Sequence, residues 1–139
     1  MLASPPMSVR LDHVGIYVAD LDAALRFYCS ALGLERPVIE DKPEHHMRIA
    51  RLRLGEVELE LIEAAVEDTM LRHMPYQGPG VYHIGLRVES TDRELERLRA
   101  AGIAALDETP REGDAMRVAF LHPSAAQGVM IELVERKAK

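Results

Sequence analysis

The chain has 139 residues, a net charge of -6 and a pI near 5.5, and 47% of its residues are hydrophobic. This length fits a single domain over residues 1–139, and the acidic balance argues against a nucleic-acid-binding protein. No stretch approaches the roughly 18 apolar residues of a membrane span, and the N-terminus lacks the pattern of a signal peptide. The single cysteine, Cys29, excludes an internal disulfide, so we expect a cytoplasmic protein.

The first half of the chain predicts a strand, a helix and further strands. Residues 11–18 alternate like a strand, and a helical pattern follows, with Asp20 suited to its N-cap and Gly33 to its end. The predicted buried face of this helix consists of residues about one turn apart, Leu21, Leu25, Tyr28 and Leu32. Residues 47–54 and 57–63 alternate like two more strands.

The second half repeats this order. Residues 81–88 match 11–18, and residues 129–135 match 57–63. Between the two matches, the pattern from Ser90 to Gly102 predicts a helix, with Thr91 and Glu94 as its capping box. The sequence therefore predicts two similar modules, at about 9–63 and 81–136, joined by a linker at about 64–80 that contains a short helical stretch.

Four polar side chains are predicted on the face of the strands that points away from the helices. Because side chains alternate along a strand, the face that carries the aliphatic residues packs under the helix. The other face then carries His13 and Glu60 from the first module, and His83 and Glu132 from the second. Alternation places the neighbouring glutamates of both final strands, Glu63 and Glu135, on the packed face, which excludes them as ligands.

Two imidazoles and two carboxylates that converge in a cleft indicate a divalent metal site. Mixed nitrogen and oxygen donors suit Zn, Co, Ni, Mn or Fe(II), and four protein ligands on an octahedral ion leave two positions for water or substrate. We expect one divalent ion, of Co, Zn, Ni or Mn.

From about residue 10 to 136 the sequence resembles the vicinal oxygen chelate superfamily, which includes glyoxalase I and the extradiol dioxygenases. The chain contains the motifs Leu11-Asp-His-Val-Gly-Ile, Tyr82-His-Ile-Gly, Val118-Ala-Phe-Leu-His-Pro123 and Gly128-Val-Met-Ile-Glu-Leu133. By these motifs it most resembles, within that superfamily, the methylmalonyl-CoA epimerases. The resemblance implies an α+β fold of two βαβββ modules in tandem, whose curled mixed sheet forms a cup around the metal. It also implies a homodimer.

The resemblance implies an isomerase that epimerises methylmalonyl-CoA or a similar 2-substituted acyl thioester. The divalent ion would stabilise an enolate after a proton leaves C2. Glu132 and Glu60 are the candidates for carrying protons on the two sides of C2. The implied partner is an acyl-CoA, with no nucleic acid and no membrane.

Four residues depart from the family pattern or have an open role. Ile49 stands where some epimerases carry an extra glutamate. Arg51 and Arg53 share the face of Ile49 by alternation, so one of them is a candidate for binding a substrate carboxylate or phosphate. A solvated edge strand is the alternative interpretation of these arginines and is slightly favoured. His122 is a candidate for touching the substrate, although a structural role in the loop is the more common one for such a residue.

Alternative functions stay open at this point. One is a glyoxalase I-like lyase or isomerase that acts on a hemithioacetal. Another is a metal-free member that sequesters a small molecule such as a drug, although such members commonly lack the four ligands found here. An extradiol dioxygenase would use two histidines and one glutamate on Fe(II), so the presence of Glu60 argues against it.

Overall fold

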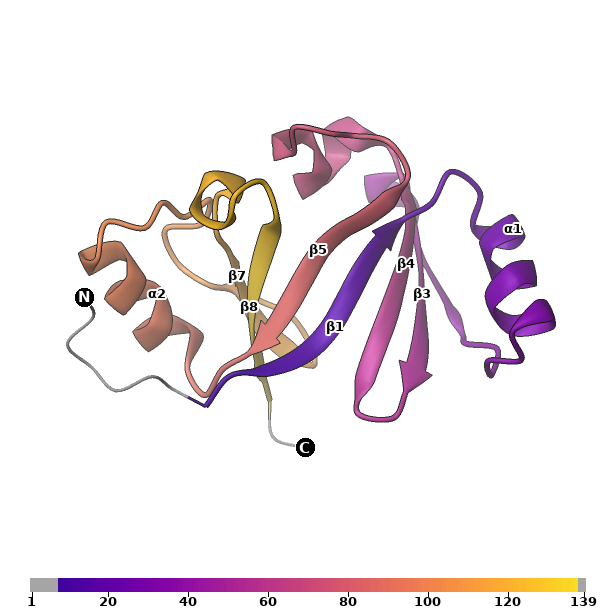
Figure 1. The fold of residues 1–139 in the computed structure, drawn as a ribbon, viewed down its shortest axis with the longest axis horizontal. Coiled ribbons are helices and arrows are strands. Elements are labelled where there is room, and N and C mark those ends of the chain that lie inside the picture. The colour runs from indigo at the N-terminus through magenta and orange to yellow at the C-terminus, as the bar shows by residue number, and fades with distance from the viewer. Residues whose placement is uncertain (1–7, 138–139) are drawn as a thin grey trace. The chain divides into compact units, whose positions relative to one another are not determined.

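A computed structural model describes residues 8–137 of the chain. These residues form two compact units, one from His13 to His83 and the other from the rest. The strands and helices, shown in Figure 1, are β1 (Arg10–Tyr17), α1 (Leu21–Leu25), β2 (Ile39–Lys42), β3 (Met47–Leu54), β4 (Val57–Ala64), β5 (Gly80–Arg87), α2 (Thr91–Ala100), β6 (Arg111–Glu112), β7 (Met116–Phe120) and β8 (Met130–Arg136). Each half of the chain thus has the predicted βαβββ order.

The strands form a mixed sheet. Within the described residues, the hydrogen-bonded strand order is β2-β3-β4-β1-β5-β8-β7-β6. β1 pairs with β4 in parallel, whereas β2 with β3, β3 with β4, β6 with β7, and β7 with β8 are antiparallel. The predicted α+β class with a mixed sheet is confirmed.

Each unit has an aliphatic core between its helix and its strands. In the unit from His13 to His83, the core contains Leu21 and Leu25 of α1 and the strand residues Leu52 and Leu61. In the other unit, Leu95 of α2 packs with residues of β7 and β8 that include Ala119 and Leu133. The faces that alternation assigned to Leu61 and Leu133 are therefore correct.

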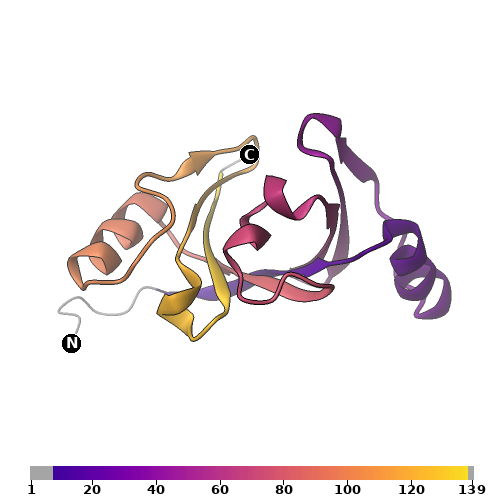
Figure 2. The ribbon, with the colours of Figure 1, turned by 90° about the horizontal axis from the view of Figure 1, so that it is seen from above.

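The segment between β4 and β5 lies on the side of β4 that faces away from α1 (Figures 1 and 2). It contains two short 3-10 turns, Val66–Asp68 and Met70–His73, which agree with the predicted short helical stretch. Met70 and Leu71 of this segment are buried.

The first helix departs from the prediction at its end. After α1 the chain continues as a π-helical turn over Arg26–Ala31, and the N–H of Leu32 donates to the carbonyl of Phe27. This wider turn rotates Leu32 off the packed face, so its side chain is 58% exposed rather than buried. Gly33 ends the helix at φ +84°, as expected for a glycine in this position.

The second helix begins one residue earlier than the predicted capping box. Ser90 is the N-cap, because its hydroxyl accepts from the N–H of Arg93 at 3.1 Å. Thr91 is the first helical residue, and Glu94 pairs with Arg97 instead of reaching back to the cap. The predicted box is therefore wrong: the cap is Ser90, the first residue of the predicted helical pattern.

Each helix also receives a carboxylate from the final strand of its own module. A Glu63 oxygen on β4 accepts from the N–H of Leu21 at 2.7 Å. A Glu135 oxygen on β8 accepts from the N–H of Thr91 at 2.9 Å and from its hydroxyl at 3.1 Å. A negative charge at a helix N-terminus satisfies free N–H groups and complements the helix dipole. These contacts connect each helix to the strand that carries a predicted ligand.

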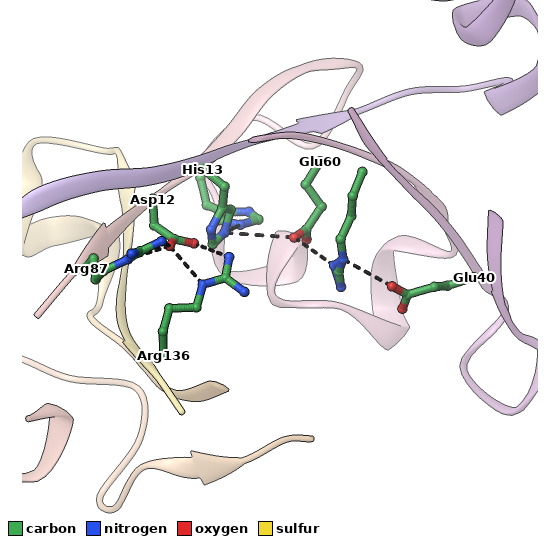
Figure 3. A network of polar contacts seen from close by, with 8 residues as sticks. Asp12, His13, Glu40, Glu60, Arg87 and Arg136 are labelled. Carbon is green, nitrogen blue, oxygen red and sulfur yellow. Dashed lines mark hydrogen bonds and ion pairs between the residues drawn. The ribbon is translucent and has the colours of Figure 1, made fainter. Parts of the chain in front are cut away.

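Asp12 on β1 is a buried carboxylate that binds two arginines (Figure 3). Arg87 of β5 donates to it at 2.9 and 3.1 Å, and Arg136 of β8 at 2.7 and 2.9 Å. Two guanidinium forks on one carboxylate compensate for its burial. The cluster thus ties the start of β1, immediately before His13, to β5 and β8.

No helix among the described residues is long and apolar enough to span a membrane.

We expect Glu135→Ala to reduce the free energy of unfolding by about 1–2 kcal/mol, because two hydrogen bonds at the start of α2 are lost. Urea unfolding followed by circular dichroism measures the change. Glu96→Ala, at an exposed position of the same helix, serves as the control. Equal effects of the two substitutions would contradict the capping role.

We expect Asp12→Asn to reduce the free energy of unfolding by about 2 kcal/mol, because two part-buried guanidinium groups lose their shared charge partner. Asp22→Asn is the matched control, since Asp22 pairs with Arg48 through a carboxylate that is 66% exposed. That control should change the free energy by less than about 0.5 kcal/mol. A fully stable Asp12→Asn protein would contradict an anchoring role.

Candidate metal centre

Two buried histidines meet in the unit from His13 to His83. His13 of β1 and His83 of β5 are 1% and 3% exposed. Their Nε2 atoms lie 2.9 Å apart, and their rings meet edge to face with centroids 4.9 Å apart. The repeat places both residues at equivalent strand positions, and the structure brings their imidazoles into direct contact.

Gly15 leaves the space that the His83 ring fills. A Cβ atom built on Gly15 would lie 2.1 Å from Cε1 of His83 and 2.2 Å from Nδ1, which is too close for any side chain. Gly15 follows His13 on the same face of β1, two residues along the strand. The His-Val-Gly motif therefore has a physical role: the histidine supplies a donor, and the glycine admits the second imidazole.

Glu60 lies beside the imidazole of His13. Gly15 is its partner across the parallel β1–β4 pair, and Arg51 is its partner across the antiparallel β3–β4 pair. An oxygen of Glu60 lies 3.9 Å from Nε2 of His13, and the residue is 9% exposed. Figure 3 shows the carboxylate pointing toward His13. The structure therefore places the Glu60 carboxylate beside His13, whose imidazole is in contact with that of His83.

Arg51 approaches the same carboxylate from the other side. Its Nη1 lies 3.5 Å from the Glu60 oxygen, and its Nε donates to Glu40 at 3.1 Å. The sequence pattern indicates Arg51 as a candidate substrate contact or as part of a solvated edge strand, and it does not predict this pairing with Glu60. The tight turn between β3 and β4, at Gly55 and Glu56, is a signal that fixes the register of the hairpin and could have predicted this pairing.

The donor geometry in this unit fits a divalent ion. With metal–nitrogen bonds of about 2.1 Å, two ligand atoms at right angles lie about 3 Å apart, and two opposite ones about 4 Å apart. The distances of 2.9 Å between the imidazole nitrogens and 3.9 Å from His13 to the Glu60 oxygen fall in this range. Neutral imidazole nitrogens and a carboxylate oxygen also suit the predicted metals.

Glu132 lies on β8, in the other unit. It is 7% exposed and stands opposite Phe120 in the antiparallel β7–β8 pair. A carboxylate this well buried requires compensation by charge or hydrogen bonding. Its predicted role as a fourth ligand stays a prediction.

The other candidate residues have structural contacts or surface positions. Ile49 is buried, at 5% exposure, and faces Ile62 on β4. Arg53 is exposed near the end of β3. The His122 ring caps the 3-10 turn Pro123–Ala126 by accepting from the N–H of Ser124 at 3.1 Å, which favours the structural interpretation of this residue.

Comparison with known proteins agrees with the sequence motifs. Residues 12–120 match the model of the Glyoxalase/Bleomycin resistance protein/Dioxygenase superfamily. The chain is 33% identical over 128 residues to the ethylmalonyl-CoA/methylmalonyl-CoA epimerase of Cereibacter sphaeroides, covering 89% of this chain and 96% of the relative.

Solved structures of epimerases share the fold. The methylmalonyl-CoA epimerase of Mycobacterium tuberculosis is 35% identical with a TM-score of 0.80, covering 99% of this chain and 94% of that one. A methylmalonyl-CoA epimerase in complex with methylmalonyl-CoA and NH4+ is 34% identical with a TM-score of 0.79, covering 94% and 96%. The family match over most of the chain and these full-length likenesses confirm the predicted kinship: this chain belongs to the Glyoxalase/Bleomycin resistance protein/Dioxygenase superfamily.

Proposed function

We propose that the protein is a metal-dependent epimerase of methylmalonyl-CoA or of a similar 2-substituted acyl thioester. The observation that carries this proposal is the meeting of two buried imidazoles, 2.9 Å apart, with the Glu60 carboxylate 3.9 Å from one of them. This arrangement occurs in a chain whose full-length relatives include methylmalonyl-CoA epimerases. Together they support an isomerase that acts on an acyl-CoA.

We infer that His13, Glu60, His83 and Glu132 hold one divalent ion of Co, Zn, Ni or Mn. Among these residues, His13, His83 and Glu132 form a group that could hold a metal ion, which supports this ligand set. When bound, the ion supplies a Lewis acid that favours negative charge on the substrate oxygens beside C2.

The protein's own contribution is proton transfer by two carboxylates. One glutamate, Glu60 or Glu132, takes the proton from C2, and the electron pair of the broken C–H bond moves into the enolate. The other glutamate then gives a proton to C2 on the opposite face, which inverts that carbon. Ile49 cannot act as an acid or base, so these two carboxylates are the proposed proton carriers.

The proposal extends to the protein's small-molecule partner, its oligomeric state and its location in the cell. Methylmalonyl-CoA or a related acyl-CoA is the proposed small-molecule partner, and the relatives' names support that substrate class. A homodimer in the cytoplasm is the proposed setting, as the family resemblance and the single cysteine suggested.

We expect the Co(II)-loaded protein to incorporate deuterium at C2 of methylmalonyl-CoA in heavy water, as observed by NMR. Glu132→Gln and Glu60→Gln should each slow this uptake by about a hundredfold or more, because each removes one proton carrier. Glu58→Gln, on the same strand as Glu60, is the control for removing a carboxylate. Absence of uptake in a protein that binds Co(II) stoichiometrically would contradict the proposed substrate and leave the metal site intact. Uptake without metal would contradict the Lewis-acid role.

We expect Gly15→Ala to weaken Co(II) binding by about tenfold or more, because the added methyl group must displace the His83 ring. Titration calorimetry measures the affinity, and the imidazole proton signals report the position of the ring. Gly113→Ala is the control, because Gly113 is far from both histidines in sequence. Its added Cβ would lie 3.1 Å from a backbone oxygen of Met116 and would not meet an imidazole. Wild-type affinity in Gly15→Ala would show that the His83 position is irrelevant to the metal.

A further inference from the structure

Arg51 stands between two carboxylates on the face of the sheet that carries the candidate ligands. Its Nε donates to Glu40 on β2 at 3.1 Å, and its Nη1 lies 3.5 Å from Glu60 on β4. Figure 3 labels these two carboxylates. The three residues come from neighbouring strands, and Arg51 lies directly opposite Glu60 in the β3–β4 register. The Arg51 side chain is 24% exposed and that of Glu60 is 12% exposed, so water screens this pair only partly.

The Arg51 guanidinium has an unused donor at this position. Nη1 is buried and forms no hydrogen bond with any described residue. Its separation of 3.5 Å from the Glu60 oxygen is an ion-pair distance, longer than a good hydrogen bond. A buried N–H group without an acceptor costs free energy. The guanidinium therefore gains stability if the Glu60 carboxylate moves closer.

One oxygen atom of Glu60 faces both neighbours. Oε2 is the atom 3.5 Å from Arg51 Nη1, and it is also the atom 3.9 Å from His13 Nε2. If an ion is held at the imidazoles, two positive charges attract the same oxygen from opposite sides. The carboxylate cannot approach one of them closely without moving away from the other.

We propose that Arg51 is a positioning residue that competes with the metal ion for the Glu60 carboxylate. The proposal rests on the proposed function for the role of the ion and of Glu60. Arg51 weakens the attachment of Glu60 to the ion, which leaves the carboxylate oxygen able to take a proton from the substrate. Glu40 holds the guanidinium in place through its hydrogen bond to Nε.

This role also accounts for the absence of a carboxylate at Ile49. A carboxylate whose electron pairs are fully engaged by a divalent ion is a poor base. In a site without a further acidic side chain at residue 49, Glu60 must serve as ligand and as base. A neighbouring cation that shares its oxygen makes the two tasks compatible, and β3 supplies that cation two residues beyond Ile49.

The test compares Co(II) binding with proton exchange in Arg51→Met. Calorimetry and the visible absorption of Co(II) measure binding without any turnover. We expect Co(II) to bind about two- to fivefold more tightly in the variant, because the competing cation is gone. We expect kcat for C2 exchange to fall about tenfold or more, with KM for the acyl-CoA changed less than about threefold.

Matched variants separate positioning from simple charge or packing effects. Arg51→Lys retains a cation without the planar fork, so its Co(II) affinity and kcat should lie between those of the wild type and Arg51→Met. Arg26→Met removes one exposed arginine of the π-helical turn and should change neither quantity. In a Glu60→Gln background, Arg51→Met should tighten Co(II) binding much less, because the shared carboxylate is absent.

The outcomes distinguish this proposal from the proposed function. Weaker Co(II) binding in Arg51→Met, together with a lower melting temperature, would show a merely structural role and overturn the inference. Unchanged binding and unchanged kcat would also overturn it. If the wild type shows no C2 exchange but Arg51→Met still tightens Co(II) binding through Glu60, the competition stands and the epimerase assignment fails.

Discussion

The approach of the His83 ring to the backbone at Gly15 is the constraint on which the candidate site depends. The ring occupies the volume where any other residue at this position would carry its Cβ. This packing brings the imidazole nitrogens of His83 and His13 to 2.9 Å, with Glu60 directly across from Gly15 on β4. The absence of a side chain at Gly15 thus allows the imidazoles of β1 and β5 to meet near the Glu60 carboxylate of β4.

In the final strand of each module, the alternation of side chains places two glutamates with different roles on opposite faces. On β4, Glu60 points toward the imidazoles, whereas Glu63, three residues later, caps α1 from the opposite face. On β8, Glu135 caps α2 in the same way, three residues after Glu132. The repeated spacing means that one strand positions a chemically useful carboxylate and also fixes the helix that packs on it.

Much of this arrangement follows from sequence periodicity, and the exceptions have physical causes. The two-residue period of a strand is enough to predict, from the sequence alone, that Glu60 and Glu63 lie on opposite faces. The prediction that Leu32 lies on the packed face was wrong because a π-helical turn changes the helical period. Periodicity in the sequence does not reveal that change. The capping box failed because Ser90 and Thr91 are both good caps, and the backbone angles decide between them.

The ion pairs of the candidate site were harder to predict than its ligands. The repeat pairs His13 with His83 by position, but the contact between the two rings requires strand packing that no local pattern encodes. The role of Arg51 depends on the register across a hairpin, and its partner Glu40 lies on a further strand. Such contacts join residues whose separation in sequence carries no periodic signal.

The spacing of Glu60 and Glu63 on one strand constrains how the gene can vary. Inserting or deleting one codon between them would turn one of the two carboxylates to the wrong face, because side chains alternate. Either the helix cap or the carboxylate beside the imidazoles would be lost in a single step. Changes in the length of this strand should therefore be eliminated by selection.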